Sequence, residues 1–208
     1  MQVNSKLIFD VGANTGSFSS LYCDDYSVIA IEANPVLAVR LKQNPKFITE
    51  SCAVSSYCGS VPFHLCAEDQ MSSCNKAWLT EMRYRDKGIQ ETIDVPCVTL
   101  DTLIEKHGLP YHIKVDTEGY ELEVLSGLSH KINSIQFEYI AEEFCNLTHP
   151  IIHRLRELGY TKYAIKDLCG DFVPNSYEQY TRTNTYSTAD EILAMNGYGL
   201  MSGMILAF

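Results

Sequence analysis

No stretch of the 208-residue sequence approaches the roughly 20 consecutive apolar residues that cross a membrane, and segment 1–6 has no apolar signal core. Basic residues are scarce too, because 16 Lys and Arg stand against 26 Asp and Glu and the formal net charge is −10. This charge disfavours non-specific binding to nucleic acid or anionic lipid and fits a neutral or cationic partner better. A soluble, cytoplasmic protein is therefore expected, with subunit number left open and a homo-oligomer allowed.

No C-x-x-C pair occurs among the eight cysteines, and most of them lie in or beside apolar runs. Free buried thiols in a reducing compartment are therefore predicted, although the even number also allows a secreted, disulfide-bonded protein. The sequence contains neither an internal repeat nor a low-complexity segment. Its length fits one domain over residues 1–208.

Two phosphate-binding patterns are absent as well, the dinucleotide turn G-x-G-x-x-G and the P-loop G-x-x-x-x-G-K-[ST]. Instead, the apolar run Leu7–Val11 leads into the turn Gly12-Ala-Asn-Thr-Gly16 and then into a helical pattern in which Phe18, Leu21 and Tyr22 share a face. Glycine lets a ligand approach the main chain, and the first N–H groups of the helix face the same space. Because no Lys or Arg is nearby to neutralise a phosphate, the turn favours a ligand with hydroxyls and a cationic centre, such as S-adenosylmethionine.

A second acid supports this ligand. The β-like run Val28–Ile31 ends in Glu32, about 20 residues after Asp10, where a carboxylate can accept hydrogen bonds from a ribose diol. Small residues after a third strand at Phe47–Thr49 leave room for a flat adenine against the backbone. A plain α/β turn with a surface acid, and a close-packed turn with no ligand, remain alternatives. The predicted cofactor-binding residues are Asp10, Gly12, Asn14, Gly16, Glu32, Ala33, Ala53, Val54 and Asp116.

Acidic residues also end the fourth and fifth predicted strands, at Asp116 and around Glu138. Because the carboxyl ends of parallel strands meet at one edge of a sheet, the four acidic strand ends predict a site there. Strands alternate with helices as in a doubly wound α/β sheet. Residues 59–98 break this alternation, and we expect a β-like strand pair with a long loop, in which Trp78 is an anchor or a stacking surface.

Four stretches together resemble the FkbM family of S-adenosylmethionine-dependent methyltransferases. They are Phe9–Gly16, Glu32 with Asn34-Pro35, Val95–Asp101 and Ile113–Gly127, of which the last, K-x-D-x-E-G-x-E followed by V-L-x-G, is the most specific. The resemblance runs from about residue 8 to about residue 167. It implies a Rossmann-like class I methyltransferase sheet of about seven strands with an antiparallel last strand, and O-methylation of sugar hydroxyls on polyketides, glycolipids or surface polysaccharides. Because the first predicted strand begins near residue 1, the N-terminal helical extension frequent in such enzymes is not expected here, and the tail after Asp167 matches nothing in the family.

An acceptor hydroxyl needs a general base within hydrogen-bond reach before it can attack the methyl group. Asp116 and Glu118 are the predicted candidates, and Lys114 would share a strand face with Asp116 and keep it ionised. The alternative is a structural turn in which Glu118 caps the following helix. Asp116 and Glu118 could also ligate Mg²⁺, but no further ligands are evident, so no metal is predicted.

The sequence therefore predicts an S-adenosylmethionine-dependent O-methyltransferase that acts on a sugar, a glycan or a glycosylated metabolite. An acceptor nitrogen is allowed. Two alternatives from other classes stay open. One is an NAD- or nucleotide-sugar-dependent protein, which the turn sequence disfavours. The other is a non-catalytic binding module, which would be expected to have lost acids from the site.

Overall fold

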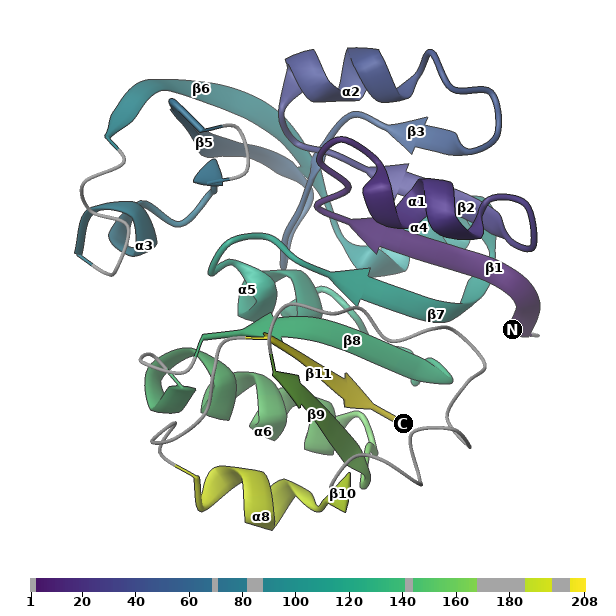
Figure 1. Ribbon diagram of the computed structural model, residues 1–208, viewed down its shortest axis with the longest axis vertical. Helices are drawn as coiled ribbons and strands as arrows, with labels where there is room; N and C mark the ends of the chain where they lie inside the picture. Colours follow the sequence, from purple (N-terminus) through teal and green to yellow (C-terminus); the bar gives the residue numbers. More distant parts are fainter. Residues whose placement is uncertain (1–2, 69–70, 82–87, 141–143, 168–185, 196–202) are drawn as a thin grey trace.

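A central mixed sheet organises the chain. The computed structural model describes residues 3–68, 71–81, 88–140, 144–167, 186–195 and 203–208, and eight strands of this part form the sheet in the order β10-β9-β11-β8-β7-β1-β2-β3 (Figure 1). The strands are β1 (Val3–Val11), β2 (Ser27–Ile31), β3 (Ile48–Glu50), β7 (Leu109–Val115), β8 (Ser134–Tyr139), β9 (Tyr163–Asp167), β10 (Tyr186–Ser187) and β11 (Gly203–Ala207).

Strand direction gives the topology. Strands β3, β2, β1, β7 and β8 are parallel, whereas β11 runs antiparallel to both β8 and β9. The chain first builds outward from β1 to β3 and then returns to β7 on the other side of β1. The carboxyl ends of β1 and β7, which are neighbours through Val11 and Val115, therefore form the switch point where open α/β sheets bind ligands. The predicted doubly wound, Rossmann-like sheet with an antiparallel last strand is confirmed, with the two-residue β10 added at the edge.

Helices cover both faces of the sheet. Side chains of α1 and α2 pack with Ile8, Val28 and Ala30 on one face, and α4, α5, α6 and α8 pack on the opposite face, on the side of Phe9 and Ile113. The helices are α1 (Ser17–Tyr22), α2 (Pro35–Leu41), α4 (Leu100–His107), α5 (Glu121–Ser126), α6 (His149–Glu157) and α8 (Ala189–Leu193), with a π-helical turn at Phe144–Thr148 before α6. No helix within the described ranges is long and apolar enough to cross a membrane.

One detail of α1 differs from the prediction. Phe18 is buried, but Leu21 is 70% exposed and does not share the buried face. The reason is Ser19, which is fully buried because its N–H and hydroxyl both donate to Asp10 under the helix. This polar contact rotates the short helix so that Ser19 faces the sheet and Leu21 turns outward.

Residues 59–98 form the predicted strand pair. Strand β5 (Gly59–Cys66) is antiparallel to β6 (Ile89–Val98), and β4 (Ala53–Val54) joins β6 on its other side. In Figure 1 this second sheet extends beyond the carboxyl ends of β1 and β7. Between β5 and β6 lies α3 (Lys76–Glu81), which the sequence analysis did not predict because a six-residue helix is too short to show an apolar stripe.

Seven of the eight cysteines lie in the described part of the chain, and these seven are free thiols, as predicted. The predicted burial is found only for Cys52, Cys66 and Cys97, whereas Cys58 and Cys145 are exposed. Cys169 and most of the tail after Asp167 lie outside the described residues.

Candidate functional site

A cavity of about 300 Å³ opens at the switch point of the sheet. It is bounded by the turn after β1, the end of β2, the small strand β4 and the segment that follows β7. Seven of the nine predicted cofactor-binding residues line it, namely Gly12, Asn14, Glu32, Ala33, Ala53, Val54 and Asp116. Six of these seven residues belong to the wall on the β1, β2 and β4 side, and Asp116 belongs to the end of β7.

Gly12 brings the main chain to the wall of the cavity. Its φ is 77°, and a Cβ atom built on it would lie 1.8 Å from the carbonyl oxygen of Asp116. Its N–H and that of Ala13 both donate to the carbonyl of Ile31 at 3.0 Å. The turn after β1 is thus fixed against both β2 and the end of β7, and only glycine fits this position.

Glu32 holds the turn from the other side. One carboxylate oxygen accepts the N–H of Asn14 and the other accepts the N–H of Asn34, both at 2.7 Å. Burial raises the pKa of Glu32, and these backbone donors oppose the rise because they favour the charged form. A carboxylate has about four lone-pair sites, so Glu32 keeps acceptor capacity for hydroxyls in the cavity.

Asp10 and Gly16 lie elsewhere. The Asp10 carboxylate is fully buried beneath α1, where Oδ2 accepts the Ser19 hydroxyl at 2.6 Å and the Ser19 N–H at 3.2 Å. Its other oxygen is 3.8 Å from the Lys114 ammonium. Burial raises the pKa of Asp10, and Lys114 opposes this rise. Gly16 precedes α1 at φ 81°, where a Cβ atom would lie 2.7 Å from the Leu41 side chain. Both residues therefore position α1 and neither lines the cavity.

This placement predicts that Asp10→Asn mainly changes stability. The variant leaves the buried Lys114 ammonium with one carboxylate fewer, so we expect the free energy of unfolding to fall by about 1–3 kcal/mol in urea titrations. The matched control is Asp24→Asn, which removes an exposed ion pair with Lys46 and should change stability by less than about 0.5 kcal/mol. Equal losses in the two variants would contradict a structural role for Asp10.

The predicted catalytic residues meet at the end of β7. The Lys114 ammonium lies 2.9 Å from Oδ2 of Asp116, as the strand periodicity predicted. Two residues further on, Glu118 lines the cavity with φ 56°, a left-handed conformation that is unusual for a residue other than glycine. Burial, followed by the nearby charges of Asp116 and Glu121, raises the pKa of Glu118 to about 8. Glu118 therefore titrates in the range where a general base is useful.

The alternative role of Glu118, as a cap of the next helix, is wrong, because α5 begins after Tyr120 and has no side-chain cap hydrogen bond; the turn is bound by Glu121 instead. Oε1 of Glu121 accepts the N–H of Thr117 at 2.8 Å, the hydroxyl of Thr117 at 3.0 Å and the N–H of Gly119 at 3.3 Å. Glu121 is buried and binds the turn, which leaves the Glu118 side chain facing the cavity.

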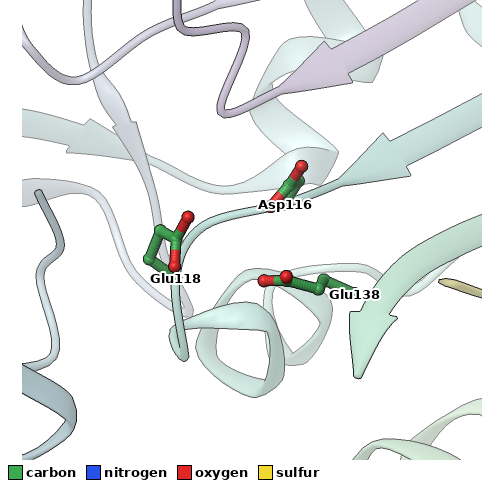
Figure 2. A group of neighbouring side chains, drawn as sticks. All are labelled: Asp116, Glu118 and Glu138. Carbon is green, nitrogen blue, oxygen red and sulfur yellow. The ribbon is translucent and has the colours of Figure 1, made fainter. Parts of the chain in front are cut away.

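The structure adds a third carboxylate that the sequence analysis did not assign. Figure 2 shows Glu138 of β8 opposite Asp116 and Glu118, and one carboxylate oxygen from each lies within 4.8 Å of the others. Three carboxylates at this spacing could hold a divalent cation such as Mg²⁺. Such a cation would compete with the Lys114 ammonium for the Asp116 carboxylate. The signal for Glu138 was its place near the end of a core strand, one of the acidic strand ends that the sequence analysis noted.

The second sheet supplies a wall that sequence reasoning missed. Phe63 of β5, together with Ser72 and Cys74 of the following segment, lines the cavity next to Tyr120. Burial raises the pKa of Cys74 to about 12, so this thiol stays neutral. No motif marks these residues, because their contribution depends on how the strand pair folds back over β4.

The sequence model of a family described as "Methyltransferase FkbM domain" matches residues 10–162. The hexuronic acid methyltransferase AglP of Haloferax volcanii is 27% identical over 138 residues, which are 63% of this chain and 53% of that protein. The chain thus spans about half the length of this relative.

Solved structures with a similar course of the chain include a precorrin-6Y C5,15-methyltransferase from Geobacter metallireducens. It is 10% identical with a TM-score of 0.47, over 100% of this chain and 81% of that one. A putative hemolysin from Lactococcus lactis is also 10% identical, with a TM-score of 0.42 over 82% and 74% of the two chains.

Proposed function

The chain belongs to the FkbM methyltransferase family, and we propose that it transfers a methyl group from S-adenosylmethionine to a hydroxyl of a sugar or glycan. The observation that carries this proposal is a cavity that is lined both by the turn after β1 with Glu32 and by the half-buried Glu118. The part of the cavity at the turn after β1 fits an uncharged nucleoside. The part at Glu118 holds a carboxylate that could remove the proton from the hydroxyl of a methyl acceptor.

The residues of this cavity fit S-adenosylmethionine. Gly12 leaves no space for a side chain, so the main chain itself faces the ligand. We propose that Glu32 accepts the ribose hydroxyls, that Ala53 and Val54 flank the adenine, and that Asn14 lies beside the methionine part. When bound, S-adenosylmethionine supplies a methyl group on a positively charged sulfur, which suits the acidic end of the cavity.

We assign the role of general base to Glu118. With a pKa of about 8 it can accept a hydroxyl proton at weakly alkaline pH and release it to solvent later. The Lys114 ammonium pairs with Asp116 at 2.9 Å, and the charge of Asp116 contributes to the raised pKa of Glu118. The remaining contribution of the protein is alignment and exclusion of water, because attack and departure must lie in line.

A sugar acceptor is supported by the hexuronic acid methyltransferase to which the chain is similar. The test is to incubate the protein with methyl-labelled S-adenosylmethionine and a panel containing a neutral oligosaccharide, a uronic-acid oligosaccharide and an amino sugar. We expect label in a sugar as an ether that survives mild base, whereas a methyl ester on a carboxyl would be hydrolysed. Binding of S-adenosylhomocysteine without label transfer to any acceptor would favour the non-catalytic alternative.

Glu32 gives a prediction on cofactor affinity. Glu32→Gln replaces one acceptor oxygen with an amide that faces the N–H of Asn14 or Asn34, so the dissociation constant of S-adenosylhomocysteine should rise by about 10- to 100-fold. Isothermal titration measures this change. Glu50→Gln is the matched control, because this carboxylate at the end of the neighbouring β3 binds Lys106 and His107 instead. An unchanged dissociation constant for Glu32→Gln would remove Glu32 from the cofactor site.

The single domain over residues 1–208, the cytoplasmic location, the lack of a nucleic-acid partner and the subunit number stay predictions.

A further inference from the structure

The segment that precedes and includes α3, Met71–Glu81, contacts the turn that carries Glu118. The Ser73 hydroxyl donates to the carbonyl of Glu118 at 2.8 Å and lies 3.3 Å from that of Thr117. The side-chain amide of Asn75 donates to the carbonyl of Gly119 at 2.7 Å. Three consecutive carbonyls of the turn are therefore bound by a segment more than 40 positions earlier in the sequence.

These donors are themselves fixed. The Ser73 oxygen accepts the N–H of Asn75 at 2.9 Å, and the Asn75 side-chain oxygen accepts the N–H of Trp78 at 3.2 Å. Each of the two side chains thus bonds on both sides, once within its own segment and once across to the turn. Such a doubly bonded arrangement leaves little rotational freedom in the contact.

Trp78 completes the contact by packing. It is fully buried, and a Cβ atom built on Gly119 would lie 2.8–3.0 Å from three atoms of its ring. The indole also forms a side-chain interaction with the Glu118 carboxylate that lowers the pKa of Glu118 against the larger effect of burial. The Trp78 ring therefore touches both the backbone and the side chain of the turn.

The turn needs this support because its conformation is unfavourable on its own. Glu118 and Gly119 have φ values of 56° and 84°, so two successive residues are left-handed and the first has a side chain. We propose that Ser73, Asn75 and Trp78 are positioning residues that hold this conformation and so aim Glu118 at the acceptor. The inference rests on the proposed function, and it gives the inserted region 59–98 a part in the chemistry.

The test uses the fact that Trp78 is the only tryptophan of the chain. Its fluorescence reports directly on the neighbouring Glu118, without any acceptor or cofactor. We expect the emission of the whole protein to change with pH around a midpoint of about 8. The transition should disappear in Glu118→Gln. A transition that persists in Glu118→Gln, or no transition in the wild-type protein, would overturn the contact.

Asn75→Ala tests the positioning. Neighbours of Ser73 line the cavity, so Asn75 is the cleaner site for substitution. We expect the turn to relax and Glu118 to become more exposed, with a fluorescence midpoint about one pH unit lower. The turnover number should fall by about 10-fold, with the KM for S-adenosylmethionine within about twofold. Thr80→Ala, whose hydroxyl bonds within α3, is the control and should change neither value. An unchanged midpoint and turnover number in Asn75→Ala would overturn the proposal.

If Asn75→Ala does not fold, Trp78→Phe tests the positioning of Glu118 instead, because this variant keeps an aromatic ring and removes the indole N–H. Because Trp78 lowers the pKa of Glu118, the variant should have a higher pKa at Glu118, and its turnover number should begin to rise only at higher pH. A rise at the same pH as in the wild-type protein would overturn the proposal. Failure of the proposed function looks different. In that case the fluorescence transition would be present while S-adenosylmethionine neither binds nor reacts.

Discussion

Glu118→Gln is expected to lower the turnover number by about 10²- to 10⁴-fold while the dissociation constant of S-adenosylhomocysteine stays within a few-fold of wild type. Glutamine has nearly the same shape but cannot accept a proton at the relevant pH. The measurement is steady-state methyl transfer with the acceptor found in the sugar panel. Glu123→Gln is the control, because this exposed carboxylate lies on α5 and bonds to Ser56 instead. A turnover number for Glu118→Gln close to that of wild type would exclude Glu118 as the base.

The pH dependence follows from the same residue. Because the pKa of Glu118 is about 8, wild-type turnover should rise with pH through about 8 as the base loses its proton. The residual activity of Glu118→Gln should lack this rise. A wild-type profile that is already flat above pH 6 would contradict the assignment.

As pH rises, the stability of the wild-type protein should fall while its turnover number rises. The folded-state pKa of Glu118 is raised from 4.5 to about 8, so between these values the folded protein holds a proton that the unfolded chain has lost. Wild-type stability therefore falls as pH rises through this window. Glu118→Gln should remove the loss, and above pH 8 it should be more stable than wild type by about 2–4 kcal/mol, since one pKa unit corresponds to about 1.4 kcal/mol. Equal stability of the two proteins at pH 5 and at pH 9 would argue against a buried, repelled carboxylate.

Gly12→Ala is expected to have the largest effect on the fold and on the cofactor site together. The new Cβ would lie 1.8 Å from the Asp116 carbonyl oxygen, a backbone atom that cannot move aside unless the ends of β1 and β7 separate. We expect a loss of more than about 3 kcal/mol in the free energy of unfolding and no measurable binding of S-adenosylhomocysteine. Urea denaturation and isothermal titration measure the two effects.

Gly88→Ala is the matched control for this substitution. Gly88 has φ 63°, and within the described part of the chain no atom beyond its chain neighbours lies within 4 Å of a built Cβ, so the left-handed conformation is the penalty, about 1–2 kcal/mol. Equal losses in the two variants would show that backbone conformation, and not the close approach of β1 to β7, explains the need for glycine at position 12.

The sheet and the parts of the cavity at the glycine turn and the strand ends could be predicted because their signals are local. Apolar runs ending in acids identified β1, β2, β7 and β8, and parallel strands bring those ends together. The glycine turn identified Gly12 for the same reason, since a tight turn after a buried strand leaves only the main chain to face a ligand. Glu32 was recognisable from its distance along the chain after Asp10.

The errors and omissions depend on contacts between distant segments. Strand periodicity places Asp10 near the strand end, but it cannot show that Ser19 takes up the carboxylate and turns it away from the cavity. Likewise, the sequence allows Glu118 to cap the next helix, and only the path of the turn shows that α5 has no side-chain cap and that Glu121 binds the turn. Trp78 is the anchor rather than the stacking surface, because it is fully buried and does not line the cavity. The contribution of Ser72 and Cys74 requires the whole strand pair to fold over the site, which no local pattern encodes.

The measurement that tests the central claim most directly is isothermal titration of the intact chain with S-adenosylmethionine, S-adenosylhomocysteine and NAD, alongside Glu32→Gln. The account predicts that the two sulfur compounds bind at one site per chain with dissociation constants on the order of micromolar. It also predicts that Glu32→Gln weakens both and that NAD gives no heat of binding. Binding of NAD alone, or of none of the three, would contradict the assignment of the cavity to S-adenosylmethionine.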